Sequence, residues 1–418
     1  MSTSDFDRAK LATPPLAPSL SPSAGTTGAR RVLLTGGRAP VTLELARLFH
    51  AAGHEVHVAE SLPQQLCRAS KAVHRNHDVP SPRFDREGFL GALEAIIRSE
   101  GIDLLIPTCE EVFHVSAGLG RLPCEVLSPP REQLRRLHSK WQFMADLEAR
   151  SEEGLRVAGV RLPRTLRVEG SESLEEALGA FPIGSKVVFK PVFSRFGTRV
   201  RIHRVGDRPP TLGASPSQPW VAQEYVAGMM VCTYAVAREG HLLAFAAYRG
   251  DYTAGPGASI YFAPFEHPAL GAFVREFVAV ERFTGQISFD FIESDGTFYP
   301  LECNPRATSG VHLFGPGDGL VEALLGTRDT TARPRPETRS MLGLAMWAYA
   351  LPKVRSLPAL IRWIKDFRRA KDALFRREDP RPLGQQLILL ASLARIARRE
   401  RLSLVEASTW DIEWNGDT

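Results

Sequence analysis

The stretch Ser288–Arg306, SFDFIESDGTFYPLECNPR, is the most informative part of this 418-residue chain for both fold and function. Asp290 lies in an apolar strand, and Glu302, Asn304 and Arg306 follow at every second position. Residues two apart on a strand face the same side, so these polar groups are expected to converge on one patch. Carboxylate and amide oxygens suit Mg²⁺ that bridges phosphates, and a guanidinium neutralises a group in transfer. The alternative interpretation is a half-buried strand end with a salt pair. The Asn-Pro-Arg ending disfavours this alternative, because these residues pack poorly.

Composition indicates an ordinary globular protein. Hydrophobic residues make up 44% of the chain and charged residues 24%, which suits two or three domains with their own cores. The net charge is +5, but only 8 of the 52 basic residues are lysine, leaving 44 arginines. No basic run is interleaved with aromatic residues, so a nucleic-acid partner is not expected.

Cysteine usage and hydropathy favour a cytoplasmic protein. The five cysteines are scattered without a C-x-x-C pair, so neither a disulfide framework nor a structural zinc site is indicated. No apolar run reaches membrane-spanning length, so membrane insertion is not expected. Residues 1–30 are rich in Pro, Ser, Ala and Thr, lack a signal-peptide pattern, and are predicted to be a disordered tail.

Residues 31–128 alternate between strand and helix patterns, which predicts a small parallel sheet with helices on both faces. The turn Gly36-Gly37 after the first strand lacks G-x-G-x-x-G spacing, so a tight turn is favoured over a dinucleotide contact. A short-chain dehydrogenase would need Tyr-x-x-x-Lys on a helix. The only such spacing, Tyr349 to Lys353, is interrupted by Pro352, which excludes that class.

Residues 129–326 begin with two helices and continue mainly as strands, which predicts an α+β domain built on antiparallel sheet. A linker rich in Pro, Arg and Thr (327–338) leads to a mainly helical region, 339–418. There an apolar stripe recurs at helical spacing with basic residues opposite. We interpret the stripe as a face packed on the protein itself, with membrane or partner binding as the alternative. Its members are Leu357, Leu360, Ile361, Ile364 and Phe367.

Two upstream segments suit a polyphosphate ligand. Lys190 ends an apolar strand and is followed by a turn that contains Ser194 and Gly197. A cation beside a loop with hydroxyl and glycine residues can surround phosphate oxygens. Further on, Glu224, Tyr225 and Val226 close another strand, where backbone groups and a carboxylate can read an adenine edge.

Together these segments, in the order FKP, QEYV and D-x(11)-E-x-N-P-R, resemble the ATP-grasp superfamily, in particular its branch of carbamoyl phosphate synthase and carboxylate–amine ligases. The resemblance covers residues 31 to about 325. It implies a small parallel-sheet pre-ATP-grasp domain (31–128), a two-lobed ATP-grasp domain (129–326) and a helical C-terminal extension. It implies these roles: Lys140 and Lys190 on the ATP phosphates, Ser194–Gly197 as lid, Glu224, Tyr225 and Val226 as adenine hinge, Asp290, Glu302 and Asn304 as Mg²⁺ ligands, and Arg306 with Lys190 as catalytic residues.

The resemblance implies an ATP-dependent ligase that uses Mg²⁺, with Mn²⁺ as an alternative ion. It would activate a small-molecule carboxylate as an acyl phosphate and join it to an amine, releasing ADP and phosphate. Bicarbonate or carbamate activation and a non-catalytic ATP-binding protein are the alternatives, and a homodimer is an option because dimers are common in the family. His312 is a candidate general base, and Arg195 or Arg199 a candidate contact for an anionic substrate. The Gly255–Ala258 turn is a candidate wall of the acceptor pocket, and the terminal TWDIEWNGDT segment either closes over the site or docks on the core.

Overall fold

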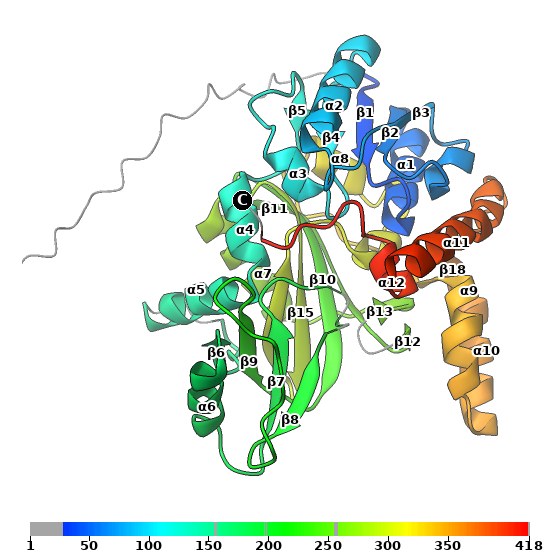
Figure 1. Ribbon diagram of the computed structural model, residues 1–418. Coiled ribbons are helices and arrows are strands. Elements are labelled where there is room, and N and C mark those ends of the chain that lie inside the picture. Colours follow the sequence, from blue (N-terminus) through cyan, green and yellow to red (C-terminus); the bar gives the residue numbers. More distant parts are fainter. Residues whose placement is uncertain (1–27, 154–156, 196, 198, 255–257, 417–418) are drawn as a thin grey trace, which may run out of the picture.

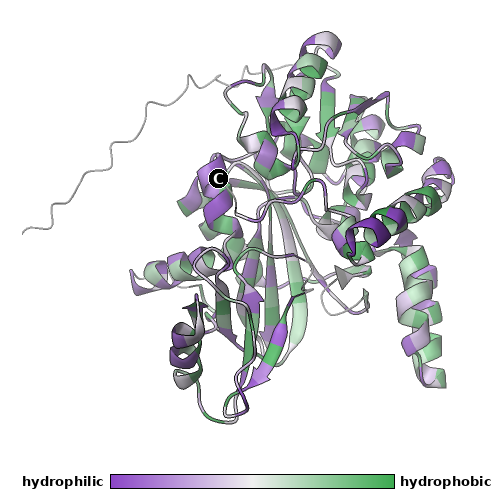
Figure 2. Ribbon diagram, viewed as in Figure 1, coloured by the Kyte–Doolittle hydropathy of each residue, from purple (hydrophilic) through white to green (hydrophobic). Residues whose placement is uncertain are grey.

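The computed structural model describes residues 28–153, 157–195, 197, 199–254 and 258–416. The predicted disordered tail therefore lies, apart from residues 28–30, outside the described part of the chain. Figure 1 shows a sheet with its helices at the top, a large twisted sheet in the middle and a smaller sheet beside it. Figure 2 shows that hydrophobic residues concentrate on the strands of the upper and middle sheets. In the described residues no helix is long and apolar enough to cross a lipid bilayer.

The first sheet is entirely parallel, with strand order β3-β2-β1-β4-β5. Val32 and Leu34 pack with helix α1, whereas the alternating Leu33 packs with helix α2, so the two helices cover opposite faces. This confirms the predicted small parallel sheet. Its elements are β1 (Arg31–Thr35), α1 (Pro40–Ala51), β2 (Glu55–Glu60), η1 (Leu66–Ala69), β3 (Arg75–Asp78), α2 (Arg86–Glu100), β4 (Leu104–Ile106), α3 (Val112–Ser116) and β5 (Glu125–Val126).

The Gly36-Gly37 turn after β1 is filled by the protein's own side chains. Gly36 has a positive φ of 76°, and a Cβ there would lie 2.7 Å from Thr108 Oγ1. A Cβ at Gly37 would lie 1.9 Å from Gln65 Oε1. The turn therefore requires glycine for packing, which supports the interpretation as a tight turn.

A four-stranded antiparallel sheet of order β6-β9-β7-β8 follows. Strand β8 begins at Arg201, where its pairing with β7 begins. The elements of this region are α4 (Arg131–His138), α5 (Lys140–Glu152), β6 (Thr165–Val168), α6 (Ser171–Gly179), β7 (Lys186–Pro191), β8 (Arg201–Arg204) and β9 (Trp220–Glu224).

The large sheet has strand order β16-β15-β10-β11-β14-β17-β18 and is antiparallel except between β17 and β18. Helix α7 packs on it through phenylalanines, among them Phe273 and Phe277 against Phe289. Its elements are β10 (Met229–Arg238), β11 (His241–Arg249), β14 (Tyr261–Pro264), α7 (Pro268–Glu281), β15 (Gly285–Ser294), β16 (Thr297–Asn304), β17 (Ser340–Met341) and β18 (Lys371–Asp372).

The remaining elements are short or belong to the C-terminal region. They are β12 (Thr253–Ala254), β13 (Ala258–Ser259), η2 (Ser309–Leu313), α8 (Leu320–Leu325), α9 (Gly343–Ala345), η3 (Met346–Ala350), η4 (Leu351–Lys353), α10 (Leu357–Arg369), α11 (Arg381–Glu400) and α12 (Leu404–Ala407). The predicted helical C-terminal region is therefore present.

The prediction that the apolar stripe of α10 packs on the protein is wrong for three of its members. Leu357, Ile361 and Ile364 are 69%, 58% and 43% exposed. The buried anchor is Trp363, whose ring lies 5.0 Å from Trp347 and 5.1 Å from Phe367. The buried Trp363 therefore marks the face of the helix that turns inward.

Candidate active site

The carboxylates of the opening stretch lie side by side on the large sheet. In the pairing of β15 with β16, Asp290 is opposite Glu302 and Ser288 is opposite Asn304, with a bulge directly after Asp290. The Asn304 Nδ2 donates to Asp290 Oδ2 at 3.2 Å. Cys232 on β10 is the register partner of Asp290 and continues the row. Because partners across strands face the same side, these polar groups share one face of the sheet.

Two lysines reach this row from neighbouring elements. Lys140 begins helix α5, whose N-cap Ser139 accepts a hydrogen bond from the Gln142 N–H. The Lys140 Nζ lies 3.0 Å from Glu302 Oε2 and donates to the Ser194 carbonyl oxygen at 2.6 Å.

Lys190 comes from strand β7 of the small sheet. Its Nζ donates to the Leu301 carbonyl oxygen at 3.1 Å and to Gln223 Oε1 at 3.0 Å. The structure thus brings together the two scarce lysines and the three oxygen-bearing side chains Asp290, Glu302 and Asn304. Gln223 is a contact that the sequence analysis missed, since a lone buried glutamine on a strand gives no signal of its own.

The two carboxylates of this cleft are paired unequally with cations. Burial opposes ionisation of Glu302, but Lys140 and Lys190 outweigh it and lower its pKa to about 2. Burial, and then the neighbouring charge of Glu302, raise the pKa of Asp290 to about 7. Burial also lowers the pKa of Lys190 to about 8. Two adjacent carboxylates and an amide oxygen are the ligand types of a hard divalent cation, which would relieve the repulsion at Asp290.

Arg306 lies beside this row but is held by an acid of the first sheet. Its Nε donates to Glu110 Oε1 at 2.8 Å, and its NH2 donates to Asn304 Oδ1 at 3.4 Å. Glu110 also pairs with Arg195, whose NH2 lies 3.0 Å from Glu110 Oε2. Burial opposes ionisation of Glu110, but Arg195 and Arg306 hold its pKa well below its usual range. Glu110 is therefore ionised and lies between the guanidinium groups of Arg195 and Arg306.

Residues 409–414, which we term the C-terminal strap, lie against the same arginines. Glu413 Oε2 accepts from Arg195 NH1 at 2.5 Å, and Glu413 Oε1 accepts from Arg83 NH1 at 2.6 Å. The Trp414 ring stacks on Phe113 with centroids 4.9 Å apart. In Figure 1 the red C-terminal segment runs from α12 across the junction of the upper and middle sheets towards α4. The strap therefore docks on α3 through Trp414 and also contacts Arg195, which pairs with Glu110 beside Arg306. Closure over the site stays a prediction.

The predicted adenine hinge is only partly aligned with the cleft. Along β9, Gln223 faces Lys190, so the next side chain, Glu224, turns to the opposite face. The Glu224 carboxylate accepts from the Arg164 N–H at 3.1 Å, and the Tyr225 N–H donates to the Lys186 carbonyl oxygen at 3.3 Å. The side chain of Glu224 is thus not brought to Lys190. Val226 follows directly, half-buried at the end of the strand.

The predicted lid is described at Ser194, Arg195 and Gly197, while Phe196 and Thr198 lie outside the described residues. Gly197 has a φ of 63°, in the left-handed region that favours glycine. Arg195 is already paired with two carboxylates, and the Arg199 guanidinium lies 5.6 Å from the Trp220 ring. Arg195 is therefore not a free contact for an anionic substrate, whereas the exposed Arg199 remains a predicted contact.

His312 does not join the cleft. Its ring is buried, stacks on Phe262 and places Nδ1 3.5 Å from Glu44 Oε2. Arg376 NH2 donates to the same carboxylate at 2.6 Å. His312 thus belongs to a buried network that ties α1 to the C-terminal region, which removes it as a base for the incoming nucleophile. The first three residues of the predicted Gly255–Ala258 turn lie outside the described residues.

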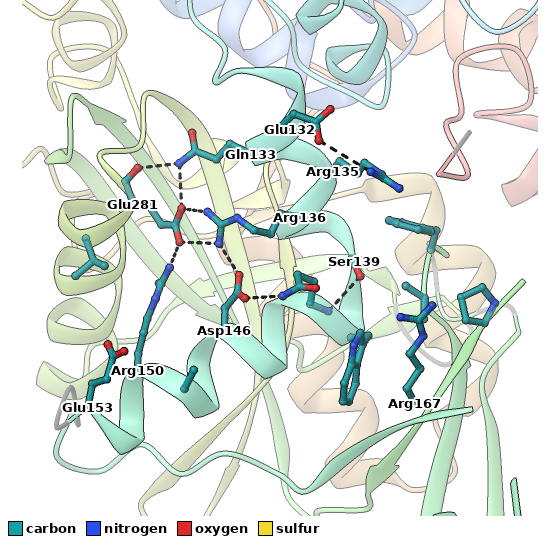
Figure 3. Close-up of a pocket in the computed structure, with 17 residues that line it drawn as sticks. Glu132, Gln133, Arg135, Arg136, Ser139, Asp146, Arg150, Glu153, Arg167 and Glu281 are labelled. Atoms are coloured by element: carbon teal, nitrogen blue, oxygen red, sulfur yellow. Dashed lines mark hydrogen bonds and ion pairs between the residues drawn. The ribbon is translucent and has the colours of Figure 1, made fainter. Parts of the chain in front are cut away.

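A second charged region lies on the other side of α5. This region lines a cavity of about 930 Å³. Figure 3 shows that the carboxylate of Glu281 contacts Arg136 and Arg150, and that Asp146 contacts Arg136. Burial opposes ionisation of Glu281, but the two arginines outweigh it and lower its pKa. Because these cations are matched by carboxylates, the network ties α4, α5 and α7 together and does not offer an anion site.

Comparisons with solved structures identify the fold. The chain is similar to N5-carboxyaminoimidazole synthetase from Staphylococcus aureus, at 13% identity and a TM-score of 0.57 over 76% of this chain and 83% of that chain. It is similar to N5-carboxyaminoimidazole ribonucleotide synthetase from Thermus thermophilus, at 18% identity and a TM-score of 0.54 over 74% and 81%. It is also similar to biotin carboxylase from Campylobacter jejuni, at 13% identity and a TM-score of 0.56 over 75% and 74%. No protein-family profile and no curated protein matches the sequence. The chain has the ATP-grasp fold.

Proposed function

We propose that the chain is an ATP-dependent ligase that activates a small-molecule carboxylate as an acyl phosphate and joins it to an amine. The products are ADP, inorganic phosphate and an amide-type bond. The observation that carries this proposal is the pairing of Asp290 with Glu302 on the large sheet, with the Lys140 ammonium 3.0 Å from Glu302. Two solved neighbours hold a nucleotide: N5-carboxyaminoimidazole synthetase from Staphylococcus aureus holds ADP, and biotin carboxylase from Campylobacter jejuni holds an ATP-type ligand. This supports a nucleotide as the ligand of the cleft.

In this proposal Asp290, Glu302 and Asn304 hold Mg²⁺, which supplies charge neutralisation at the β- and γ-phosphates when bound, and Mn²⁺ has the same ligand preference. The residues of the chain perform the positioning. Lys140 and Lys190 are donors that approach from two different elements and leave their present partners for phosphate oxygens. Each lysine then loses its hydrogen bond to a backbone carbonyl, of Ser194 or of Leu301, and gains a charge-assisted hydrogen bond to phosphate.

The reaction has two steps. An oxygen of the substrate carboxylate attacks the γ-phosphorus, and the bond between that phosphorus and the β–γ bridging oxygen breaks, so ADP leaves. The amine nitrogen then attacks the acyl carbon, phosphate departs with the C–O bonding pair, and the nitrogen loses one proton. Arg306, held beside Asn304 by Glu110, is positioned to neutralise charge on the transferred group. No side-chain nucleophile is required, because positioning and charge neutralisation supply the catalysis.

A cytoplasmic location is part of the proposal. All five cysteines are free, and Cys67 and Cys303 are buried. A reducing compartment suits a protein that carries this many unpaired thiols.

The test is phosphate release from Mg-ATP against a panel of carboxylates and amines, each offered alone and in pairs. The proposed ligase releases phosphate well above background only when one carboxylate and one amine are both present, and Glu302→Gln abolishes this release. Release that needs bicarbonate in place of the carboxylate would establish the carboxylase alternative. Protection from thermal unfolding by Mg-ATP without turnover on any pair would establish a non-catalytic binding protein.

A further inference from the structure

A group of histidines gathers at one edge of the parallel sheet, away from the cleft. The sequence carries His54-x-x-His57 before and within β2, and His74-x-x-His77 before and within β3. Four of the eleven histidines of the chain therefore lie on or directly before two neighbouring strands, far more than an even distribution would place there. The proposed ligase chemistry does not use them.

Three side chains of this edge could share one metal ion. Glu55, His57 and His74 each offer a ligand atom, and these atoms all lie within 4.8 Å of one another. Glu55 and His57 are two apart on β2 and face the same side, and the His74 N–H donates to the Val56 carbonyl oxygen at 2.7 Å. The backbone thus fixes the position of His74 next to the strand that carries the other two.

We propose that Glu55, His57 and His74 form a Zn²⁺ site at the β2–β3 edge of the parallel sheet. Two imidazoles and one carboxylate are a recurrent zinc ligand set, with a water molecule at the remaining tetrahedral position. Tetrahedral Zn²⁺ with bonds of about 2.1 Å separates its ligand atoms by about 3.4 Å, so the widest pair must close by up to about 1.4 Å.

The three ligands divide into one fixed and two adjustable groups. The His57 ring is fully buried, while Glu55 is about one-third exposed and His74 is exposed. The His57 Nε2 already lies 3.0 Å from Glu55 Oε1. Because Glu55 and His74 lie at the surface, their side chains can rotate towards the His57 ring without movement of the sheet.

His77 contacts the ring nitrogen of His57 that does not face the proposed metal. The His57 Nδ1 lies 3.1 Å from His77 Nε2, and the two rings stack at 5.4 Å. When Nε2 of an imidazole binds metal, its Nδ1–H needs an acceptor, and the His77 Nε2 atom lies at the right distance to accept from it.

The competing contact is weak. The Arg31 Nε lies 3.3 Å from Glu55 Oε1, but both side chains are well exposed. An exposed ion pair of this kind contributes little to stability and is displaced at small cost by a divalent cation.

The site would stabilise the edge of the sheet rather than take part in catalysis. β3 is an edge strand, and none of its four residues is buried. Glu55 begins β2, whereas Glu60 at the other end of the strand accepts from Arg38, which contacts Asp411 of the C-terminal strap. The proposed zinc therefore lies at the opposite end of the strand from the candidate active site.

The test is calorimetric titration of Zn²⁺ into the untagged, metal-free chain in excess Mg²⁺, which occupies oxygen-only sites. The expected result is one Zn²⁺ per chain, with affinity lowered at least about tenfold in His74→Ala and in Glu55→Gln. The matched control is His50→Ala, which changes an exposed histidine near the end of α1 and should leave the affinity unchanged.

Two further measurements make the result decisive without any assay of activity. Bound Co²⁺ should give the visible absorption of a tetrahedral site in the wild-type chain and lose it in His74→Ala. Zn²⁺ should also raise the melting temperature of the wild-type chain and not that of His74→Ala. Absence of Zn²⁺ binding in excess Mg²⁺, or equal affinity in wild type and His74→Ala, would overturn the proposal.

Discussion

Helix α5 separates two clusters of charge that differ in how their carboxylates are paired with cations. On one side, the carboxylate of Glu281 lies between Arg136 and Arg150, and its pKa is lowered by them. On the other side, Asp290 lies beside Glu302, and burial and this like charge raise its pKa to about 7. In the first cluster, which we term matched, each carboxylate contacts an arginine, and the network stabilises the fold. In the second, which we term unmatched, the fold holds Asp290 against a like charge at a cost in stability, and ligands often bind at such sites.

The largest expected effect is on the unmatched side. Asp290→Asn removes a proposed cation ligand and should lower turnover by about a thousandfold. It also removes the repulsion with Glu302, so the free energy of unfolding at pH 8 should stay equal or rise. Phosphate release and urea unfolding measure the two quantities. Retained turnover, or a clear loss of stability, would contradict the assignment of this pair.

The mirror-image substitution on the matched side is Glu281→Gln. It leaves the Arg136 and Arg150 guanidinium groups without their shared carboxylate, and should lower the free energy of unfolding by about 3 kcal/mol. Turnover should remain within about twofold of wild type under conditions where the variant is folded. The same two assays apply. A variant that keeps its stability but loses turnover would show that the cavity of Figure 3 belongs to the chemistry.

A smaller effect is expected from the C-terminal strap. Glu413→Gln weakens the contacts to Arg83 and Arg195, so water reaches the acyl phosphate more readily. Phosphate release with the carboxylate alone should rise by about tenfold, the equivalent of 1.4 kcal/mol. Glu400→Gln, at the end of α11, is the matched control. Equal amine-independent release in both variants would show that the strap only docks on the core.

The smallest expected effect is a pH dependence that passes through His138. This buried ring packs against Phe113 and the strap residue Trp414, and burial lowers its pKa to about 3. The unfolded chain, with a histidine pKa of about 6.5, binds more protons than the folded chain between these values. Stability is therefore full above pH 6.5 and is lost as the pH falls towards 3, by about 0.7 kcal/mol between pH 7 and 6.

Urea unfolding at both pH values measures this dependence. In His138→Gln the difference should shrink, whereas His241→Gln, at an exposed histidine, should keep the wild-type difference. Identical pH dependence in all three chains would contradict the role given to His138.

The cleft was predictable because its signal is local. Glu302, Asn304 and Arg306 follow one another at a spacing of two, which fixes their side chains to one face whatever the tertiary structure is. Lys140 and Lys190 stood out because lysine is scarce in this chain. The parallel sheet was predictable for a related reason, since alternating strand and helix patterns admit few topologies.

The arrangement around Glu110 was not predictable, because its contacts cross the whole chain. Arg195 and Glu413 are 218 residues apart, and Glu110 and Arg306 are 196 apart. An isolated arginine or glutamate carries no record of such a partner. The prediction of which face of α10 is buried was wrong for a different reason. Trp363 is buried, whereas three members of the aliphatic stripe that periodicity favoured are exposed.

The most direct test of the account is the Mg²⁺ dependence of nucleotide binding. A non-hydrolysable ATP analogue is titrated calorimetrically into wild type, Asp290→Asn and Glu281→Gln, each with and without Mg²⁺. Tight binding that needs Mg²⁺ in wild type and Glu281→Gln, and is lost in Asp290→Asn, is the predicted result. Binding that is equally tight in Asp290→Asn, or that ignores Mg²⁺ in the wild-type chain, would contradict it.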